Sequence, residues 1–153
     1  MPNLCFNQLR VSGNPERLRA FTDLLCGEES PLDFEKVLPT PEDELLSDTW
    51  RDWRIQHWGC KWNADDVEMD MPDDGSVVYT FVTPWRQPEN LFYVLATVFH
   101  DLNLVLVFVE PMADIAGIMK YNGKVLTGIS GTVEEMRVKD SFIEEAANEY
   151  CEV

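Results

Sequence analysis

The sequence predicts an α+β domain, because three features occur in the order of the split β-α-β plan. A strand and a helix follow each other near the N-terminus, a hairpin comes after an irregular stretch, and a second helix leads into a near-continuous apolar strand. With the irregular stretch set aside, the order is β-α-β-β-α-β, which is that of ferredoxin-like folds. The chain has 153 residues, 45% of them apolar, which suits a single domain with one substantial core.

The first strand and helix have clear local signals. Residues 4–11 alternate in side-chain character and stop at Ser12-Gly13, as expected for a strand that ends in a turn. Asn14 is a good N-cap with Pro15 at the first helical position, and apolar residues then recur at helical spacing until Gly27.

Residues 28–64 form a predicted insertion, punctuated by Pro31, Pro39 and Pro41 and containing one expected short helix from Pro41 to about Ser47. Nine acidic residues fall between positions 28 and 52, and all five tryptophans lie between Trp50 and Trp85. Tryptophans clustered in this way belong either to a dense part of a core or to a contact surface.

The elements that follow complete the predicted sheet. Positions 66–71 alternate between carboxylates and apolar residues, Pro72-Asp73-Asp74-Gly75 is turn chemistry, and Val77 to Val82 is rich in strand formers. A helix is expected from Pro88 to about Asp101, followed by a buried strand over Leu102 to Val109.

The C-terminal part predicts additions to this plan. A second hairpin joins residues 115–121 and 124–127 through Asn122-Gly123. Thr132 and Glu135 have the spacing of a capping box, which predicts a final acidic helix over residues 132–153.

The negative net charge limits the kinds of partner that the protein can bind. The chain has 12 Lys and Arg against 28 Asp and Glu, a formal charge of −16 with a pI near 4.3. Such a field repels nucleic-acid phosphates and anionic membranes and attracts basic protein surfaces. The four cysteines form no C-x-x-C pair, and the longest apolar run is too short to span a bilayer. We therefore expect a cytoplasmic protein with free thiols that contacts neither nucleic acid nor membrane directly.

Sequence motifs for a metal, a cofactor or catalysis are incomplete. Asp70, Asp74 and Gly75 match part of a calcium loop, but Pro72 and Phe81 replace two of its ligands. His57-x-x-Cys60 is half of a zinc site without a second pair, and Gly128-Ile-Ser-Gly131 is too short to cradle phosphate. The sequence therefore predicts no metal, no cofactor and no catalytic residues, and hence a protein that is not an enzyme.

Two surfaces remain as candidate binding sites. The first is an acidic face, either simply solvated or a docking surface for a basic partner, made of Asp66, Glu68, Asp70, Asp73, Asp74, Glu144, Glu145 and Glu149. The second is an aromatic patch, either core that covers the sheet or a mixed aromatic and basic contact, made of Trp58, Lys61, Trp62, Asn63 and Trp85. In the core interpretation, Lys61 and Asn63 satisfy buried backbone groups.

Several phrases together resemble the ferredoxin-like domain of the YubB-type proteins of plasmids and phages. They are the N-terminal PNLCFNQLRVSG, then LDFEKVLP, WGCKWNA and FVTPW, and the resemblance spans about residues 2 to 121. Cys60 stands where a small hydroxyl residue is expected, and the acidic helix after Thr132 looks like an addition. The resemblance implies a small protein of a mobile element and supplies no catalytic residue.

These observations lead to one principal functional hypothesis. The protein is expected to be a non-catalytic, acidic interaction protein of a phage or plasmid that acts in the host cytoplasm. It would inhibit a host defence or nucleic-acid-processing complex by occupying a basic surface, in the manner of anti-CRISPR or anti-restriction proteins, with carboxylates that imitate DNA phosphates. The alternative is a small-ligand or peptide-binding module that uses Trp58, Trp62 and Trp85.

Overall fold

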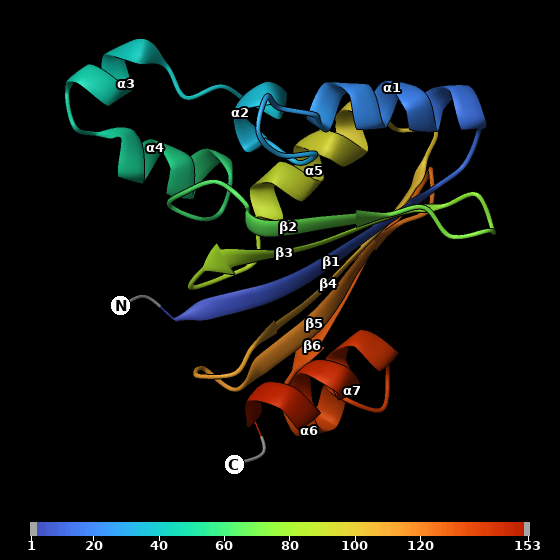
Figure 1. Cartoon of the computed structure of the whole chain (residues 1–153). Helices are drawn as coiled ribbons and strands as arrows, with labels where there is room; N and C mark the ends of the chain where they lie inside the picture. The colour runs from blue at the N-terminus through green and yellow to red at the C-terminus, as the bar shows by residue number, and fades with distance from the viewer. Residues whose placement is uncertain (1–2, 152–153) are drawn as a thin grey trace.

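The computed structural model describes residues 3–151 and contains one six-stranded antiparallel sheet in the order β2-β3-β1-β4-β5-β6 (Figure 1). The strands are β1 Leu4–Ser12, β2 Asp65–Asp70, β3 Val77–Pro84, β4 Asn103–Glu110, β5 Ile115–Tyr121 and β6 Leu126–Gly131. The order β2-β3-β1-β4 is that of a ferredoxin-like sheet, so the predicted fold class is confirmed. β5 and β6 extend the sheet beyond β4, which therefore lies in its interior.

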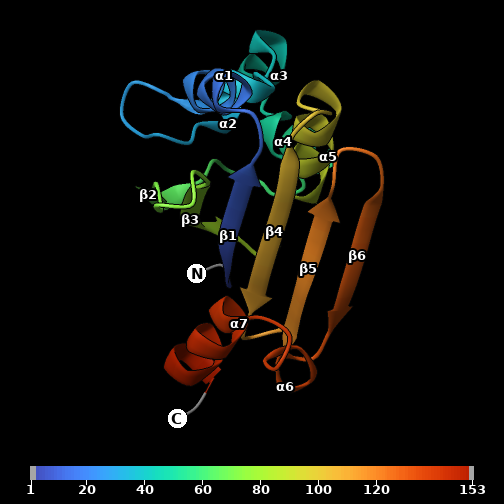
Figure 2. The same ribbon diagram turned by 90° about the vertical axis from the view of Figure 1, so that its right-hand side faces the viewer.

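Helices cover both faces of the sheet (Figures 1 and 2). The first face lies under α1 Pro15–Leu25, α2 Phe34–Val37, α3 Glu42–Leu46, α4 Trp50–His57 and α5 Glu89–Val98. The second face lies against α6 Val133–Met136, α7 Ser141–Ala146 and the π-helix η1 Ala147–Cys151. We call these the first and second faces throughout.

The main core fills the space between the first face and its helices. The strands contribute every second residue, as the pleat requires, so that Leu9 of β1 and Tyr79 and Phe81 of β3 meet Phe21 of α1 and Leu95 of α5. α1 begins as predicted, since Asn14 Oδ1 accepts hydrogen bonds from the N–H groups of Glu16 and Arg17.

A second, smaller core covers only part of the second face. It lies under α6, α7 and η1 and draws its strand residues from β4 and β5; its buried members are Val107, Val109, Ala116, Ile118, Val133, Met136, Ile143, Ala146 and Ala147. The second face of β2, β3 and β1 is therefore less completely covered than that of β4 and β5.

The prediction of one continuous helix over residues 132–153 was wrong. Thr132 Oγ1 accepts a hydrogen bond from Glu135 N at 3.1 Å, as the capping box requires, but α6 ends at Met136. The chain then starts a new helix, because the Asp140 carboxylate accepts from Phe142 N and acts as a second N-cap. Residues 152 and 153 of the predicted helix lie outside the described residues.

The second hairpin has the predicted partners but a shifted boundary. Asn122 Oδ1 accepts hydrogen bonds from Lys124 N at 3.0 Å and Val125 N at 2.8 Å, which draws both residues into the turn. β6 consequently runs from Leu126 to Gly131 instead of over residues 124–127, and it includes the glycine pair at 128 and 131.

The insertion is more helical than its prolines indicated. The predicted short helix is present as α3, whereas α2 and α4 were not predicted. α4 carries two of the five tryptophans and five charged or polar residues in eight, so its pattern alone is a weak helix signal. Within residues 3–151, every helix is too short or too polar to cross a membrane.

Candidate binding site

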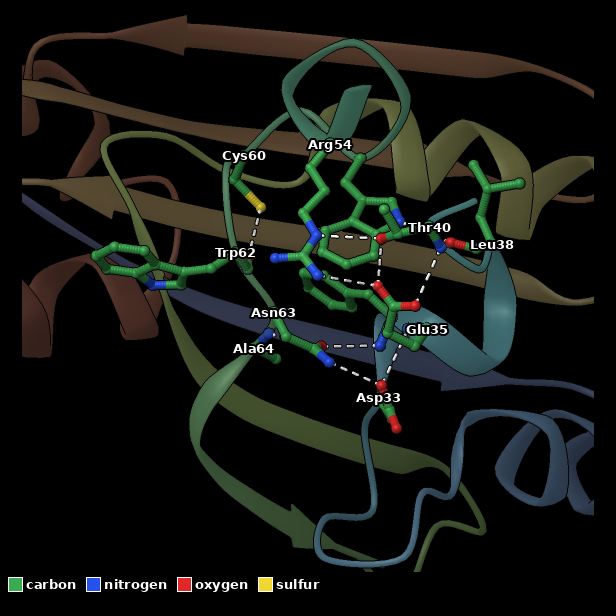
Figure 3. Close-up of polar contacts among 11 residues, drawn as sticks. Asp33, Glu35, Leu38, Thr40, Arg54, Cys60, Trp62, Asn63 and Ala64 are labelled. Carbon is green, nitrogen blue, oxygen red and sulfur yellow. Dashed lines mark hydrogen bonds and ion pairs between the residues drawn. The ribbon is translucent and has the colours of Figure 1, made fainter. Parts of the chain in front are cut away.

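The tryptophan segment, residues 50–62, supports the insertion from within, and Figure 3 shows the polar contacts made by Arg54 and Asn63 in this region. Trp58 is completely buried, and its indole Nε1 donates a hydrogen bond to Leu38 O at 2.9 Å. The Arg54 guanidinium lies 4.8 Å from the Trp50 ring centroid and 4.9 Å from that of Trp58. Arg54 therefore stacks on both rings and links α4 to the buried indole.

Polar contacts extend this support toward α2. Arg54 donates to Thr40 Oγ1 at 3.1 Å and pairs with Glu35 at 3.4 Å, while the Glu35 carboxylate also accepts hydrogen bonds from the backbone N–H and hydroxyl of Thr40. The charge of Arg54 is thereby neutralised within this network.

Asn63 closes the insertion, as the core interpretation predicted. Its Oδ1 accepts hydrogen bonds from Phe34 N at 2.9 Å and Ala64 N at 2.8 Å, and its Nδ2 donates to Asp33 at 2.7 Å (Figure 3). Lys61 does not satisfy buried backbone; its ammonium lies 4.6 Å from the Trp62 ring centroid.

The predicted aromatic patch is therefore not one surface. Trp58 is buried, Asn63 is engaged with the backbone, and only Trp62, which is half-buried, and Trp85, which is 51% exposed, keep accessible rings. Large rings at contact surfaces must be reachable by a partner, so Trp58 is excluded from binding.

The His57 and Cys60 pair is also part of the packed structure. His57 Nδ1 lies 2.8 Å from Trp53 O, and its ring stacks on that of Trp53. Burial raises the pKa of Cys60 to about 12, and burial likewise raises the pKa of Cys5, so both thiols stay protonated and unreactive. Residues 3–151 contain no group of three or more His, Cys, Asp and Glu side chains arranged to hold a metal ion.

A groove of about 340 Å³ lies on the second face, between the sheet and the C-terminal helices. β2, β3 and β1 form one side of it, and α7 and η1 form the other. The residues that line it are Phe6, Asp66, Glu68, Thr80, Phe81, Val82, Phe142, Glu145, Ala146, Glu149 and Tyr150. We call it the acidic groove, because four of these residues are carboxylates and none is a cation.

The four carboxylates come from two distant parts of the chain. Asp66 and Glu68 belong to β2, and Glu145 and Glu149 belong to α7 and η1. The register of β2 against β3 shifts between Asp65 and Glu68, and Asp66 has a φ of 53°. This bulge adds one residue to β2 opposite β3 and locally bends the strand beside the groove.

Between the carboxylates, the floor of the groove is apolar. The rings of Phe6 and Tyr150 stack with centroids 4.0 Å apart and planes at 8°, and Val82 and Phe142 continue this surface. A hydrogen bond with Glu149, burial and the nearby charges of Glu149 and Asp66 raise the pKa of the Tyr150 hydroxyl. The phenol therefore remains a neutral donor at physiological pH.

The other predicted acidic residues lie elsewhere or are already paired. Asp70 follows Glu68 on the same face of β2 but does not line the groove, and Asp73 and Asp74 belong to the hairpin turn. Glu144 is bound to Arg137 at 2.8 Å. Sequence reasoning did not identify Phe6, Phe142 and Tyr150; the alternation of β1 places Phe6 opposite the main core, and this was the available signal.

Comparisons with known proteins support the fold. No family model matches the sequence, and no curated protein matches it. A crystal structure of the protein api92 from Yersinia pseudotuberculosis, assigned to the DUF1281 family, is similar with a TM-score of 0.62. The alignment covers 86% of this chain and 98% of that one at 12% identity, a level that indicates a shared fold alone.

Proposed function

We propose that this protein is a non-catalytic binding protein that holds a cationic segment of a partner protein in its acidic groove. The observation that carries the proposal is the convergence of Asp66, Glu68, Glu145 and Glu149 around an apolar floor without a neutralising cation among the lining residues. An acidic face that is merely solvated would need neither converging carboxylates nor an apolar floor between them.

The chemistry of the groove favours arginine or lysine as the side chain bound. The aliphatic part of such a side chain packs on apolar surface, while its charged end reaches carboxylates. Stacked aromatic rings such as Phe6 and Tyr150 also suit a planar guanidinium. The formal charge of −16 adds long-range attraction that raises the association rate.

Basic segments of this kind are typical of nucleic-acid-binding proteins, so we place the partner in that class. The origin in a phage or plasmid, the host cytoplasm as the place of action and the inhibition of a host defence complex belong to the same proposal; the sequence resemblance supports them. We favour the groove over the aromatic patch, because Trp58 is buried and Arg54 and Asn63 are bound within the insertion.

A peptide titration tests the proposal. The probe is a fluorescent decapeptide in which arginine alternates with leucine, and its anisotropy is measured at low and high salt. The groove variant is the triple change Glu68→Gln, Glu145→Gln and Glu149→Gln. The control is the triple change Glu28→Gln, Glu29→Gln and Glu42→Gln, which removes the same charge from exposed sites of the insertion.

We expect the groove variant to bind roughly tenfold more weakly, since three partly exposed charge pairs together contribute about 1–3 kcal/mol. The control should lose about twofold through net charge alone. Equal losses in the two variants, or a larger loss in the control, would overturn the groove as the binding site.

A further inference from the structure

The outer edge of β6 has no partner in the part of the chain that the structure describes. On its inner side, β6 pairs with β5 in an unbroken register from Leu126 opposite Tyr121 to Gly131 opposite Ala116. Apart from this ladder, residues 126–131 form no backbone–backbone hydrogen bond within residues 3–151. Figure 2 shows the outer side of β6 open along its length.

The opposite edge of the sheet, β2, is protected against pairing with a further strand. β2 carries four carboxylates in six residues and contains the bulge at Asp66, and both features oppose pairing with a further strand. β6 has the sequence Leu-Thr-Gly-Ile-Ser-Gly, without charge, proline or bulge. Only one of the two edges is therefore suited to accept another strand.

The charge distribution identifies the strand that fits. Residues 115–131 contain no Asp or Glu and two lysines, Lys120 and Lys124, within a chain of formal charge −16. Two acidic copies of this protein repel each other over most of their surfaces, whereas β6 itself is uncharged and adds no repulsion between like-charged side chains. A neutral strand suits a neutral partner, whereas the basic segment that fits the acidic groove has no counter-charge on β6.

The exposed side chains of β6 agree with this assignment. Leu126 is 44% exposed and lies opposite Tyr121 on the first face, and Ile129 is 54% exposed and lies opposite Ile118 on the second face. Antiparallel pairing of two β6 strands about a two-fold axis would place such residues beside strand neighbours on both faces.

We infer that β6 pairs with β6 of a second copy of this chain, so that two six-stranded sheets become one continuous antiparallel sheet. Because the two-fold axis then stands perpendicular to the sheet, the second faces of both copies point the same way. The dimer presents both acidic grooves on one side. This pairing is independent of what the grooves bind.

Sedimentation velocity of the full chain tests the dimer at several protein concentrations and at two salt concentrations. The edge variant is Thr127→Lys with Ile129→Lys, because lysines on an edge strand oppose pairing. The control is Leu46→Lys with Val138→Lys, at residues 81% and 82% exposed, and it changes the net charge equally. We expect a dimer for the wild type and the control, and a monomer for the edge variant.

Salt provides a second criterion. Screening weakens repulsion between two acidic copies, so the dimer should become tighter as salt rises, opposite to the binding of a basic peptide. A wild-type chain that stays monomeric at every concentration, or an edge variant that dimerises like the control, would overturn the inference.

If circular dichroism shows that the edge variant does not fold, cysteine cross-linking tests the dimer instead. Thr127→Cys, Gly128→Cys and Ile129→Cys are each made with Cys26→Ser; a Cβ at Gly128 meets only Ile118 O, at an ordinary 3.8 Å. At least one of the three should form a disulfide-linked dimer, while Leu46→Cys in the same background should not. Equal cross-linking at all four positions would contradict pairing through β6.

Discussion

Arg10 and Asp140 form a bidentate ion pair that joins β1 to the start of α7. Nη1 of Arg10 lies 2.9 Å from Oδ2 of Asp140, and Nη2 lies 2.7 Å from Oδ1. The same carboxylate caps α7 by accepting from Phe142 N at 2.8 Å. One side chain therefore both starts the helix that forms a side of the acidic groove and fixes that helix to the sheet.

We expect Asp140→Asn to lower the free energy of unfolding at pH 7 by about 1 kcal/mol, because Arg10 is partly exposed and solvent screens the lost charge. Asparagine remains a good N-cap, so the change isolates the ion pair from the capping bond. Urea unfolding of Arg10→Met, Asp140→Asn and the double variant measures the coupling directly. A coupling near zero would show that the pair does not fix α7.

The pH dependence of stability should report the same pair. Burial acts to raise the pKa of Asp140, but the hydrogen bonds from Arg10 and Phe142 prevail and hold it below its ordinary value of 3.8. A carboxyl whose pKa is depressed by folding stabilises the native state above its unfolded pKa. This stabilisation is lost as the pH falls below 3.8 through the folded pKa. Asp140→Asn should flatten that part of a stability curve measured from pH 2 to 7 relative to the wild type.

Glu68 and Asp70 provide a matched comparison within one strand. Both are exposed and lie on the second face of β2, but only Glu68 lines the acidic groove. We expect Glu68→Lys to weaken binding of the arginine peptide about tenfold and Asp70→Lys to weaken it about twofold, with both melting temperatures within a few degrees of the wild type. Equal losses would mean that net charge, and not the groove, determines affinity.

Tyr79 has a fully buried side chain whose hydroxyl lacks a hydrogen-bond partner among residues 3–151. Leaving a buried hydroxyl unpaired costs free energy, and phenylalanine has the same shape without that group. We expect Tyr79→Phe to raise the free energy of unfolding by about 1 kcal/mol, measured by urea denaturation at neutral pH. A loss of stability would show that a water molecule satisfies the hydroxyl.

Alkaline pH tests the burial of the Tyr79 hydroxyl separately. Burial, and then the nearby Cys26, raise the pKa of Tyr79 above its ordinary value of 10.0. A group whose pKa rises on folding stabilises the native state below its unfolded pKa, and this contribution is lost as the pH rises beyond it. The wild type should therefore lose more stability than Tyr79→Phe when the pH passes 10.0.

Trp58 and Trp85 should differ sharply in their effect on stability. Trp58→Phe removes the hydrogen bond to Leu38 O and part of the stacking surface of Arg54, so we expect a loss of about 2–4 kcal/mol. Trp85 is 51% exposed, and Trp85→Ala should cost less than about 1 kcal/mol. Chemical denaturation of both variants measures the difference, and similar losses would contradict the assignment of Trp58 as the support of the insertion.

The parts of the fold that could be predicted from sequence depend on local signals. Asn14 and Pro15 mark the start of α1, the alternation around Glu68 marks β2, and the apolar run of β4 marks an interior strand. The start of α7 depends instead on Asp140, whose capping role coincides with a contact to Arg10, which is 130 positions away in the sequence. No local pattern contains that contact.

The candidate site was predictable only in part for the same reason. The sequence predicted that the carboxylates of β2 and of the C-terminal segment belong to one acidic face. Their convergence around a groove, however, requires α7 to lie against the second face. The tryptophan segment was ambiguous because an indole that supports a core and one that binds a partner occur in similar sequence contexts. The bond from Trp58 to Leu38 O resolves that ambiguity, and it is visible only in three dimensions.

The C-terminal cover of the second face is a small unit with its own cluster of buried side chains. It consists of two short helices and a π-helix, held by a few apolar side chains and by Arg10. Such units open locally at a lower free energy than global unfolding, so the amide hydrogens of α7 should exchange faster than those of β1. The groove exists only while this unit is closed. By thermodynamic linkage, a cationic peptide bound in the groove stabilises the closed unit by the same free energy by which closure strengthens peptide binding. Protection of α7 against exchange is thus a direct measure of groove occupancy.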